Sequence, residues 1–145
     1  MPPAMKKLNM KSVLTALLSL AALGFLLFGL TSYHYYSTIG IDNERVQGEQ
    51  VDYRYYRFWW PGNGALLVGF GETIKPYNPK VQYDLFDPAG TLLRSPYKPL
   101  EVQSLWNRLG FWWINNSNPR QFWVGVPALL PAFLLGSAWW RLRKR

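Results

Sequence analysis

The sequence predicts a membrane protein of mixed α and β class, in which two transmembrane helices flank a small antiparallel β-sandwich-like domain outside the cytoplasm. Two long, uncharged, apolar stretches at residues 12–30 and 122–140 predict the helices. Between them, short aromatic and β-branched segments alternate with clusters of turn residues, a pattern typical of antiparallel sheets.

The first apolar stretch predicts a transmembrane helix over residues 12–33. A run of about 20 apolar residues is long enough to cross the hydrocarbon core of a bilayer. Residues 1–11 form a basic N-terminus, which we expect in the cytoplasm. A cleaved signal peptide is the competing interpretation, because the start is basic and small residues follow at Thr31 and Ser32. The apolar run is longer than that of a signal peptide and no A-x-A pattern follows it, which favours a retained anchor.

The second apolar stretch predicts a transmembrane helix over residues 120–140. Pro127 and Pro131 lie four residues apart, so in a helix they share one face and are expected to kink it. The tail at residues 141–145 is basic and predicts a cytoplasmic C-terminus.

The distribution of charge predicts the topology. The formal net charge is +8, and the two basic termini contain none of the eight acidic residues. This is the positive-inside pattern, so both termini are expected in the cytoplasm and residues 34–119 outside it, most simply at a bacterial inner or plasma membrane. The middle segment lacks a basic stripe with interleaved stacking aromatics, which argues against nucleic acid as a partner.

Turn residues divide the middle segment into short predicted strands. The turn cluster Pro61, Gly62, Asn63 and Gly64 predicts a hairpin. The strands are expected at residues 51–60, 65–70, 81–86, 91–94 and 100–105, with a loop at 72–79, a turn at 87–90 and a break at 95–99.

The aromatic segment at residues 104–114 fits two structures. As a helix it is amphipathic and suits the headgroup region before the second span. As a last strand of the sheet it contains Gly110 at a weak point. We expect residues 115–119 to be a linker into the membrane.

Small and aromatic residues of the spans predict helix packing and membrane interfaces. Small residues at helical spacing let helix backbones approach closely, either to each other or to a partner protein. The helix-packing residues are Thr15, Ser19, Ala22, Gly29, Ala128, Ala132 and Gly136. The aromatic residues expected at membrane interfaces are Tyr33, Tyr35, Tyr36, Trp112, Trp113, Trp123, Trp139 and Trp140.

No pattern in the sequence predicts catalysis, a metal site or a bound cofactor. The chain has no cysteine and a single histidine, His34, so neither a two-histidine metal site nor a Ser-His pair can form. His34 as a lone axial ligand to a haem or chlorophyll-type ring is an alternative to its place in an aromatic belt. The apolar stretches at residues 12–30 and 122–140 contain no Asp, Glu, Lys, Arg or His, which argues against a transporter or channel acting alone.

The segment at residues 51–60 is the candidate partner-binding site. A strand alternates its side chains between two faces, and here both faces are aromatic. Aromatic and Arg residues are the usual anchors of protein interfaces. The candidate residues are Tyr53, Arg54, Tyr55, Tyr56, Arg57, Phe58, Trp59 and Trp60.

Together these features favour a non-catalytic, two-pass accessory or structural subunit of a larger membrane complex. Its expected partners are membrane lipid and other integral membrane protein subunits, with the outer β domain as a protein-interaction module. Two alternatives remain open: an extracytoplasmic ligand-binding or sensing module, and a pigment- or haem-associated subunit of a photosynthetic or respiratory complex.

Overall fold

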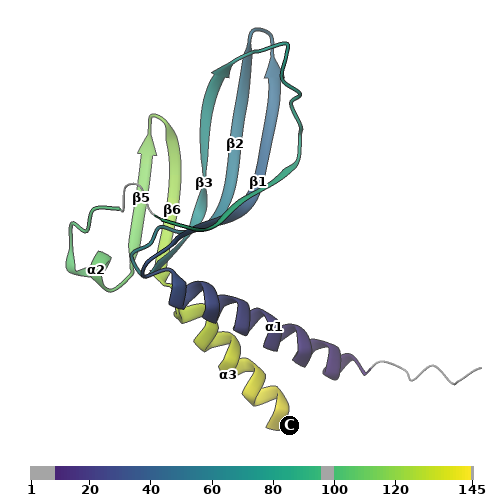
Figure 1. The fold of residues 1–145 in the computed structure, drawn as a ribbon, viewed down its shortest axis with the longest axis vertical. Helices are drawn as coiled ribbons and strands as arrows, with labels where there is room; N and C mark the ends of the chain where they lie inside the picture. Colours follow the sequence, from purple (N-terminus) through teal and green to yellow (C-terminus); the bar gives the residue numbers. More distant parts are fainter. Residues whose placement is uncertain (1–8, 96–99, 145) are drawn as a thin grey trace, which may run out of the picture.

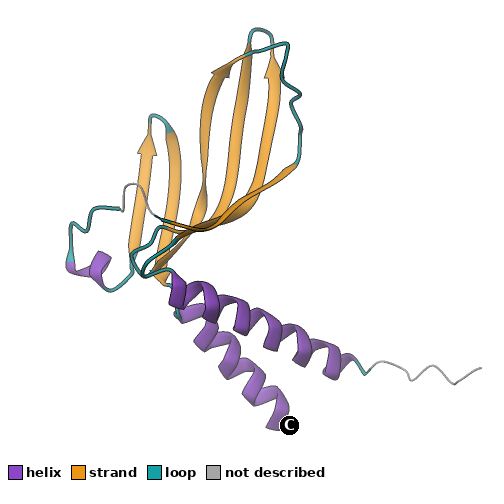
Figure 2. Ribbon diagram, in the orientation of Figure 1, coloured by secondary structure: helices purple, strands orange, loops and turns teal. Residues whose placement is uncertain are grey.

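The computed structural model describes residues 9–95 and 100–144, in which one antiparallel sheet is joined at one end to a pair of helices (Figures 1 and 2). The helices are α1 (Met10–Thr31), α2 (Leu105–Arg108) and α3 (Leu130–Lys144). The strands are β1 (Tyr36–Gln47), β2 (Gln50–Trp60), β3 (Ala65–Pro76), β4 (Asp87–Arg94), β5 (Trp112–Ser117) and β6 (Arg120–Pro127).

The six strands lie in the order β4-β1-β2-β3-β6-β5, and every neighbouring pair is antiparallel. The predicted hairpin at residues 61–64 is confirmed, because it joins β2 to β3. The other long hairpin joins β1 to β2 through Gly48, whose φ of +62° suits a residue without a side chain.

A single sheet replaces the predicted sandwich. Residues 81–86 and 100–105 form no strand, so the described part of the chain contains no second sheet to pack on the first. The predicted turn at residues 87–90 lies instead within β4, an edge strand that tolerates Pro88. Residues 72–76 extend β3, although Pro76 and Pro79 predicted a loop there. Strand β1 was not predicted.

The second predicted span is also wrong as a continuous helix. Residues 120–127 form β6, which pairs with β3 on one side and β5 on the other, and α3 begins only at Leu130. No proline kinks a helix here, because Pro127 ends the strand and Pro131 lies in the first turn of α3, where a missing N–H has no cost. The predicted linker at residues 115–119 is part of β5 and of the turn between β5 and β6.

Within the described residues, α1 is the one helix long and apolar enough to cross a membrane. Only 6% of its most apolar window is buried, which distinguishes it from the core helix of a globular domain. A signal sequence near the N-terminus also passes this test of length and composition, so the finding is consistent with either an anchor or a signal sequence. Helix α3 is shorter, at 15 residues, and its last turn is basic.

Both helices are fixed to the same end of the sheet by the turn between β2 and β3. The backbone N–H of Gly64 donates to the carbonyl oxygen of Ser32 over 3.0 Å, and the N–H of Ala128 donates to the carbonyl oxygen of Gly64 over 2.9 Å. As a result α1 and α3 leave the sheet side by side (Figure 1).

The aromatic segment at residues 104–114 contains both expected structures in succession. The short helix α2 ends at Arg108, and Gly110 then turns the chain with a φ of +91° into β5. The Cβ of any other residue at position 110 would also approach the Cα of Pro127 within 2.7 Å. Residues 96–99, part of the predicted break, lie outside the described residues, as do Lys6, Lys7 and Arg145 of the basic termini.

Candidate functional site

Strand β2 divides the candidate partner-binding residues between the two faces of the sheet. Its odd-numbered residues Tyr53, Tyr55, Arg57 and Trp59 share one face, here called the tyrosine face. Its even-numbered residues Arg54, Tyr56, Phe58 and Trp60 share the other, here called the apolar face. The structure therefore divides the single candidate site predicted at residues 51–60 between two different surfaces.

The tyrosine face carries a cleft of about 320 Å³, close to the lower end of small-molecule pockets. Gly69 and Gly71 of β3 let two aromatic rings lie close against this strand. A Cβ at position 71 would overlap the Tyr55 ring, and a Cβ at position 69 would lie 2.8 Å from the Trp123 ring. The cleft is lined by Tyr36, Thr38, Tyr53, Tyr55, Arg57, Trp59, Gln121 and Trp123.

An ion pair lies beside this cleft. The guanidinium of Arg57 donates through Nη2 to Oδ1 of Asp42, and their side chains are only 12% and 15% exposed. The hydroxyl of Tyr53 donates to the other carboxylate oxygen of Asp42 over 2.9 Å. Nζ of Lys75 lies 3.4 Å from the centroid of the Tyr53 ring and 3.7 Å from Oε1 of Glu44. Both oxygens of Asp42 are therefore used, while Arg57 keeps further donors.

Three of the buried donors on this face have no hydrogen-bond partner among the residues that the structure describes. Nη1 of Arg57 and Nε1 of Trp59 belong to residues that line the cleft, whereas the third, Nε1 of Trp112, lies outside it. Buried N–H groups in native proteins are nearly always paired, and an unpaired one costs about 1–3 kcal/mol. The cleft therefore favours a bound group that presents an acceptor oxygen.

The tyrosines of the cleft are neutral at physiological pH. Burial raises the pKa of Tyr53 to about 12, with a further contribution from its hydrogen bond to Asp42. Burial also raises the pKa of Tyr36 and Tyr55, although the nearby charge of Arg57 acts in the opposite direction. Their hydroxyls can therefore donate as well as accept hydrogen bonds.

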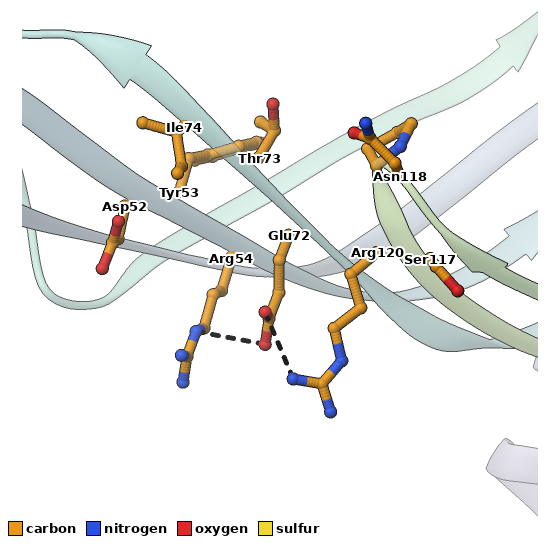
Figure 3. A pocket seen from close by; sticks show the side chains of 10 residues that line it. Asp52, Tyr53, Arg54, Glu72, Thr73, Ile74, Ser117, Asn118 and Arg120 are labelled. Atoms are coloured by element: carbon orange, nitrogen blue, oxygen red, sulfur yellow. Dashed lines mark ion pairs between the residues drawn. The ribbon is translucent and has the colours of Figure 1, made fainter.

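A second cavity, of about 440 Å³, lies between β3 and the turn that joins β5 to β6. Figure 3 shows Arg54 and Arg120 converging on Glu72, at 3.3 and 3.6 Å. The arginine side chains are 52% and 67% exposed, so each pair contributes no more than about 1 kcal/mol. This cavity is an exposed, charged surface. Among the described residues, none that lines it has a buried donor without a hydrogen-bond partner.

The predicted helix-packing residues have different surroundings. Gly29 lies against Ala128 and Leu129, and Ala128 and Ala132 are buried. The hydroxyls of Thr15 and Ser19 donate to carbonyls of their own helix. Ala22 is half-buried, and a Cβ on Gly136 would meet nothing within 4 Å.

Two of the predicted interface aromatics lie in the core instead. Trp112 and Trp123 are 8% and 4% exposed and pack with Ala65 and Leu67 on the tyrosine face, because β5 and β6 turn them inward. Tyr36 lines the cleft, and Tyr33 lies over Gly64. Trp113, Tyr35 and Trp140 are exposed, and Trp139 is half-buried next to Arg143. His34 is exposed in the turn after α1.

Sequence reasoning missed the residues that β1 and β6 contribute to this face. Thr38 and Asp42 lie on β1, which was not predicted, and Gln121 lies on β6, which was assigned to a helix. The β-branched and aromatic residues from Tyr36 to Ile41 were a usable strand signal.

The described residues contain no group of three or more His, Cys, Asp or Glu side chains that could hold a metal ion. Comparisons with protein-family models, with curated proteins and with solved structures found no match to this chain.

Proposed function

We propose that this protein is a non-catalytic, membrane-anchored accessory subunit, whose sheet binds a protein partner through the tyrosine face. The observation that carries the proposal is the pair of buried, unpartnered donors, Arg57 Nη1 and Trp59 Nε1, in an open aromatic cleft. A partner that brings an acceptor oxygen to this point satisfies both groups.

Helix α1 is the anchor in this proposal. Its length, composition and exposed leucines fit a lipid environment. Helix α3 lies beside it and carries Arg141, Arg143 and Lys144 at the end remote from the sheet. We place both basic ends in the cytoplasm and the sheet outside it, following the positive-inside rule. The uncharged part of α3 covers only about 16 Å, so the long arginine side chains must extend its reach to the headgroups.

The chemistry of the cleft indicates the kind of segment that fits it. Asp42 already neutralises the charge of Arg57, so the partner needs no net negative charge. A backbone or side-chain carbonyl oxygen satisfies the two donors, and an apolar neighbour fills the space between the aromatic rings. An extracytoplasmic loop of an integral membrane protein offers both groups and shares the membrane with α1.

The test is native purification in a mild detergent, with co-purifying subunits identified by mass spectrometry. The informative variant is Trp59→Phe, which removes the Nε1 donor and retains an aromatic ring. Loss of one neutral hydrogen bond of about 1 kcal/mol predicts roughly fivefold weaker partner binding. The matched control is Trp139→Phe on α3, which should leave recovery of the partner unchanged. A wild-type chain that purifies alone as a monomer contradicts the proposal.

A small ligand in the same cleft is the second candidate function, favoured by the cavity volume of about 320 Å³. It predicts that a compound with a carbonyl group on an apolar ring raises the melting temperature of the purified wild-type protein. The Trp59→Phe variant should then show a smaller shift. A partner protein recovered with the wild type, and no such compound effect, decides for the accessory subunit.

A further inference from the structure

The apolar face of the sheet is graded from apolar to charged along its strands. The row of paired residues nearest the helices contains Trp60, Leu66 and Val126 and packs against α1. The next row outward, here called the first row, is apolar and exposed, from 36% for Val124 to 69% for Trp113. This first row consists of Ile39, Phe58, Val68, Val124 and Trp113. A contiguous exposed patch of this kind marks a contact surface.

The next rows on the same face change character in order. The second row contains Ile41, Tyr56, Phe70 and Phe122, so aromatic rings dominate it. The third row is polar and charged, with Asn43, Arg54 and Glu72, and Arg120 lies next to Glu72 on β6. The order from apolar to polar occurs on β1, β2, β3 and β6, with an aromatic ring in the second row on all of them except β1, whereas on β5 Asn115 of the second row follows Trp113.

Helix α1 lies against the apolar end of this face. Phe28 stacks on Trp60 with ring centroids 4.8 Å apart, and Phe25 meets Phe58 edge-on at 6.3 Å. An apolar groove of about 240 Å³ lies between α1 and the sheet, with Ala21 and Gly24 on one wall and Ile39 and Phe58 on the other. The first row is therefore beside the middle of α1 rather than beyond its end.

We infer that the apolar face rests in the outer leaflet of the lipid bilayer. This inference rests on the proposed anchoring by α1, because the medium that surrounds the middle of α1 also meets Ile39 and Phe58. From the acyl chains outward, a bilayer presents an apolar layer, an interface that favours aromatic rings, and a charged headgroup layer. The three rows follow this order, with Arg54 and Arg120 placed at the phosphates.

Lipid accounts for this face better than a protein partner does. A layered medium imposes one order on every strand that enters it, and four adjacent strands share the order here. A protein contact selects a local pattern of hot-spot residues and has no need for a common gradient. With the apolar face in the leaflet, the tyrosine face with its cleft points away from the membrane, where a partner loop can reach it.

The experiment is a depth measurement on the full chain in vesicles of phosphatidylcholine and phosphatidylglycerol. The chain has no cysteine, so single cysteines can carry a nitroxide label without further changes. The labelled variants of the apolar face are Phe58→Cys, Tyr56→Cys and Arg54→Cys, one in each row. Thr38→Cys is the matched control, because it lies on the tyrosine face next to the first row, and Leu20→Cys reports on α1.

The ratio of collisions with oxygen to collisions with a water-soluble nickel chelate measures depth. It should be high at Leu20 and Phe58, fall severalfold through Tyr56 to Arg54, and be low at Thr38, which lies next to the first row on the opposite face. Val68→Cys repeats the first row on β3, in case the change at Phe58 disturbs folding.

The outcomes separate the two proposals. A high oxygen ratio at Leu20 with nickel access at Phe58 and Val68 overturns the lipid contact and leaves the anchor intact. Protection of Phe58 and Val68 from both reagents shows that protein covers this face, which also overturns the lipid contact. Nickel access at Leu20 overturns the anchoring by α1, on which both the accessory-subunit proposal and the lipid contact rest.

Discussion

Gly29 of α1 lies directly against the backbone of Ala128, so close that a Cβ at position 29 would be 2.9 Å from the carbonyl oxygen of Ala128. It would also be 2.7 Å from Cδ2 of Leu129. Because a backbone oxygen cannot move aside as a side-chain end can, this contact determines how closely α1 approaches the segment that leads into α3.

Gly29→Ala should therefore destabilise the protein. Overpacking of this kind costs about 1–3 kcal/mol, more than the helix propensity gained by replacing glycine. The matched control is Gly24→Ala in the same helix, where a Cβ would meet nothing within 4 Å. That control should leave stability unchanged or raise it. Thermal unfolding in detergent, followed by circular dichroism, compares the two, and equal melting temperatures would refute the packing argument.

The stacking of Phe28 on Trp60 should hold α1 against the sheet. Phe28→Ala removes a half-buried ring, and we expect the free energy of unfolding to fall by about 2 kcal/mol, below the range for a fully buried Phe. Leu27→Ala is the control, because that side chain is 56% exposed and faces away. Denaturant titration of both variants in the same detergent measures the difference. A larger loss for Leu27→Ala would show that α1 contacts the sheet through another face.

Asp42→Ala should lower the free energy of unfolding far more than Glu44→Ala, although both side chains lie on the same face of β1. It leaves the guanidinium of Arg57 buried without its charge partner, which typically costs about 3–5 kcal/mol. Glu44→Ala breaks only the exposed pair with Lys75, and a loss of at most about 1 kcal/mol is expected. Chemical denaturation of the two variants checks this ranking, and similar losses would mean that the Arg57 pair is solvated.

The raised pKa of Tyr53 predicts how stability responds to alkaline pH. In the folded protein the pKa is about 12, against an ordinary value of 10.0 that applies to the unfolded chain. Between these values the folded protein keeps a proton that the unfolded chain has lost, so stability should fall as pH rises through this window. Below pH 10 the contribution is fully present.

Tyr53→Phe should make the loss of stability between pH 10 and 12 less steep. Melting temperatures measured across this range for the wild type, for Tyr53→Phe and for Tyr35→Phe provide the check. Tyr35→Phe removes one exposed tyrosine, so it controls for the number of phenols. Parallel curves for all three proteins would be incompatible with a proton held by the contact between Tyr53 and Asp42.

Particular elements show how far the sequence predicts this fold. Strand β2 and its turn were predictable because the strand formers at residues 51–60 end at Pro61, Gly62, Asn63 and Gly64, which is strong local turn chemistry. Strand β4 was predicted only over residues 91–94, because Asp87, Pro88 and Gly90 have the local preferences of a turn. They form a strand because the edge of β1 supplies hydrogen-bond partners for them. The residues that β2 contributes to the cleft were identified from the sequence. Gln121 of the cleft and Asp42 beside it were not, because Gln121 lies on β6, which was predicted as a helix, and Asp42 lies on β1, which was not predicted.

The sequence alone determined α1, because a long uncharged run forms a helix and avoids water whatever surrounds it. It also determined that β2 would present aromatic rings on both faces. Only the tertiary structure decided the state of residues 120–127, since Phe122, Trp123 and Val124 suit a membrane helix and a buried strand equally well. The outcome depends on the free edge of β3, whose hydrogen-bonding groups pair with β6 although β3 lies far from it along the chain. Strand β5 pairs with the other edge of β6 through a short turn.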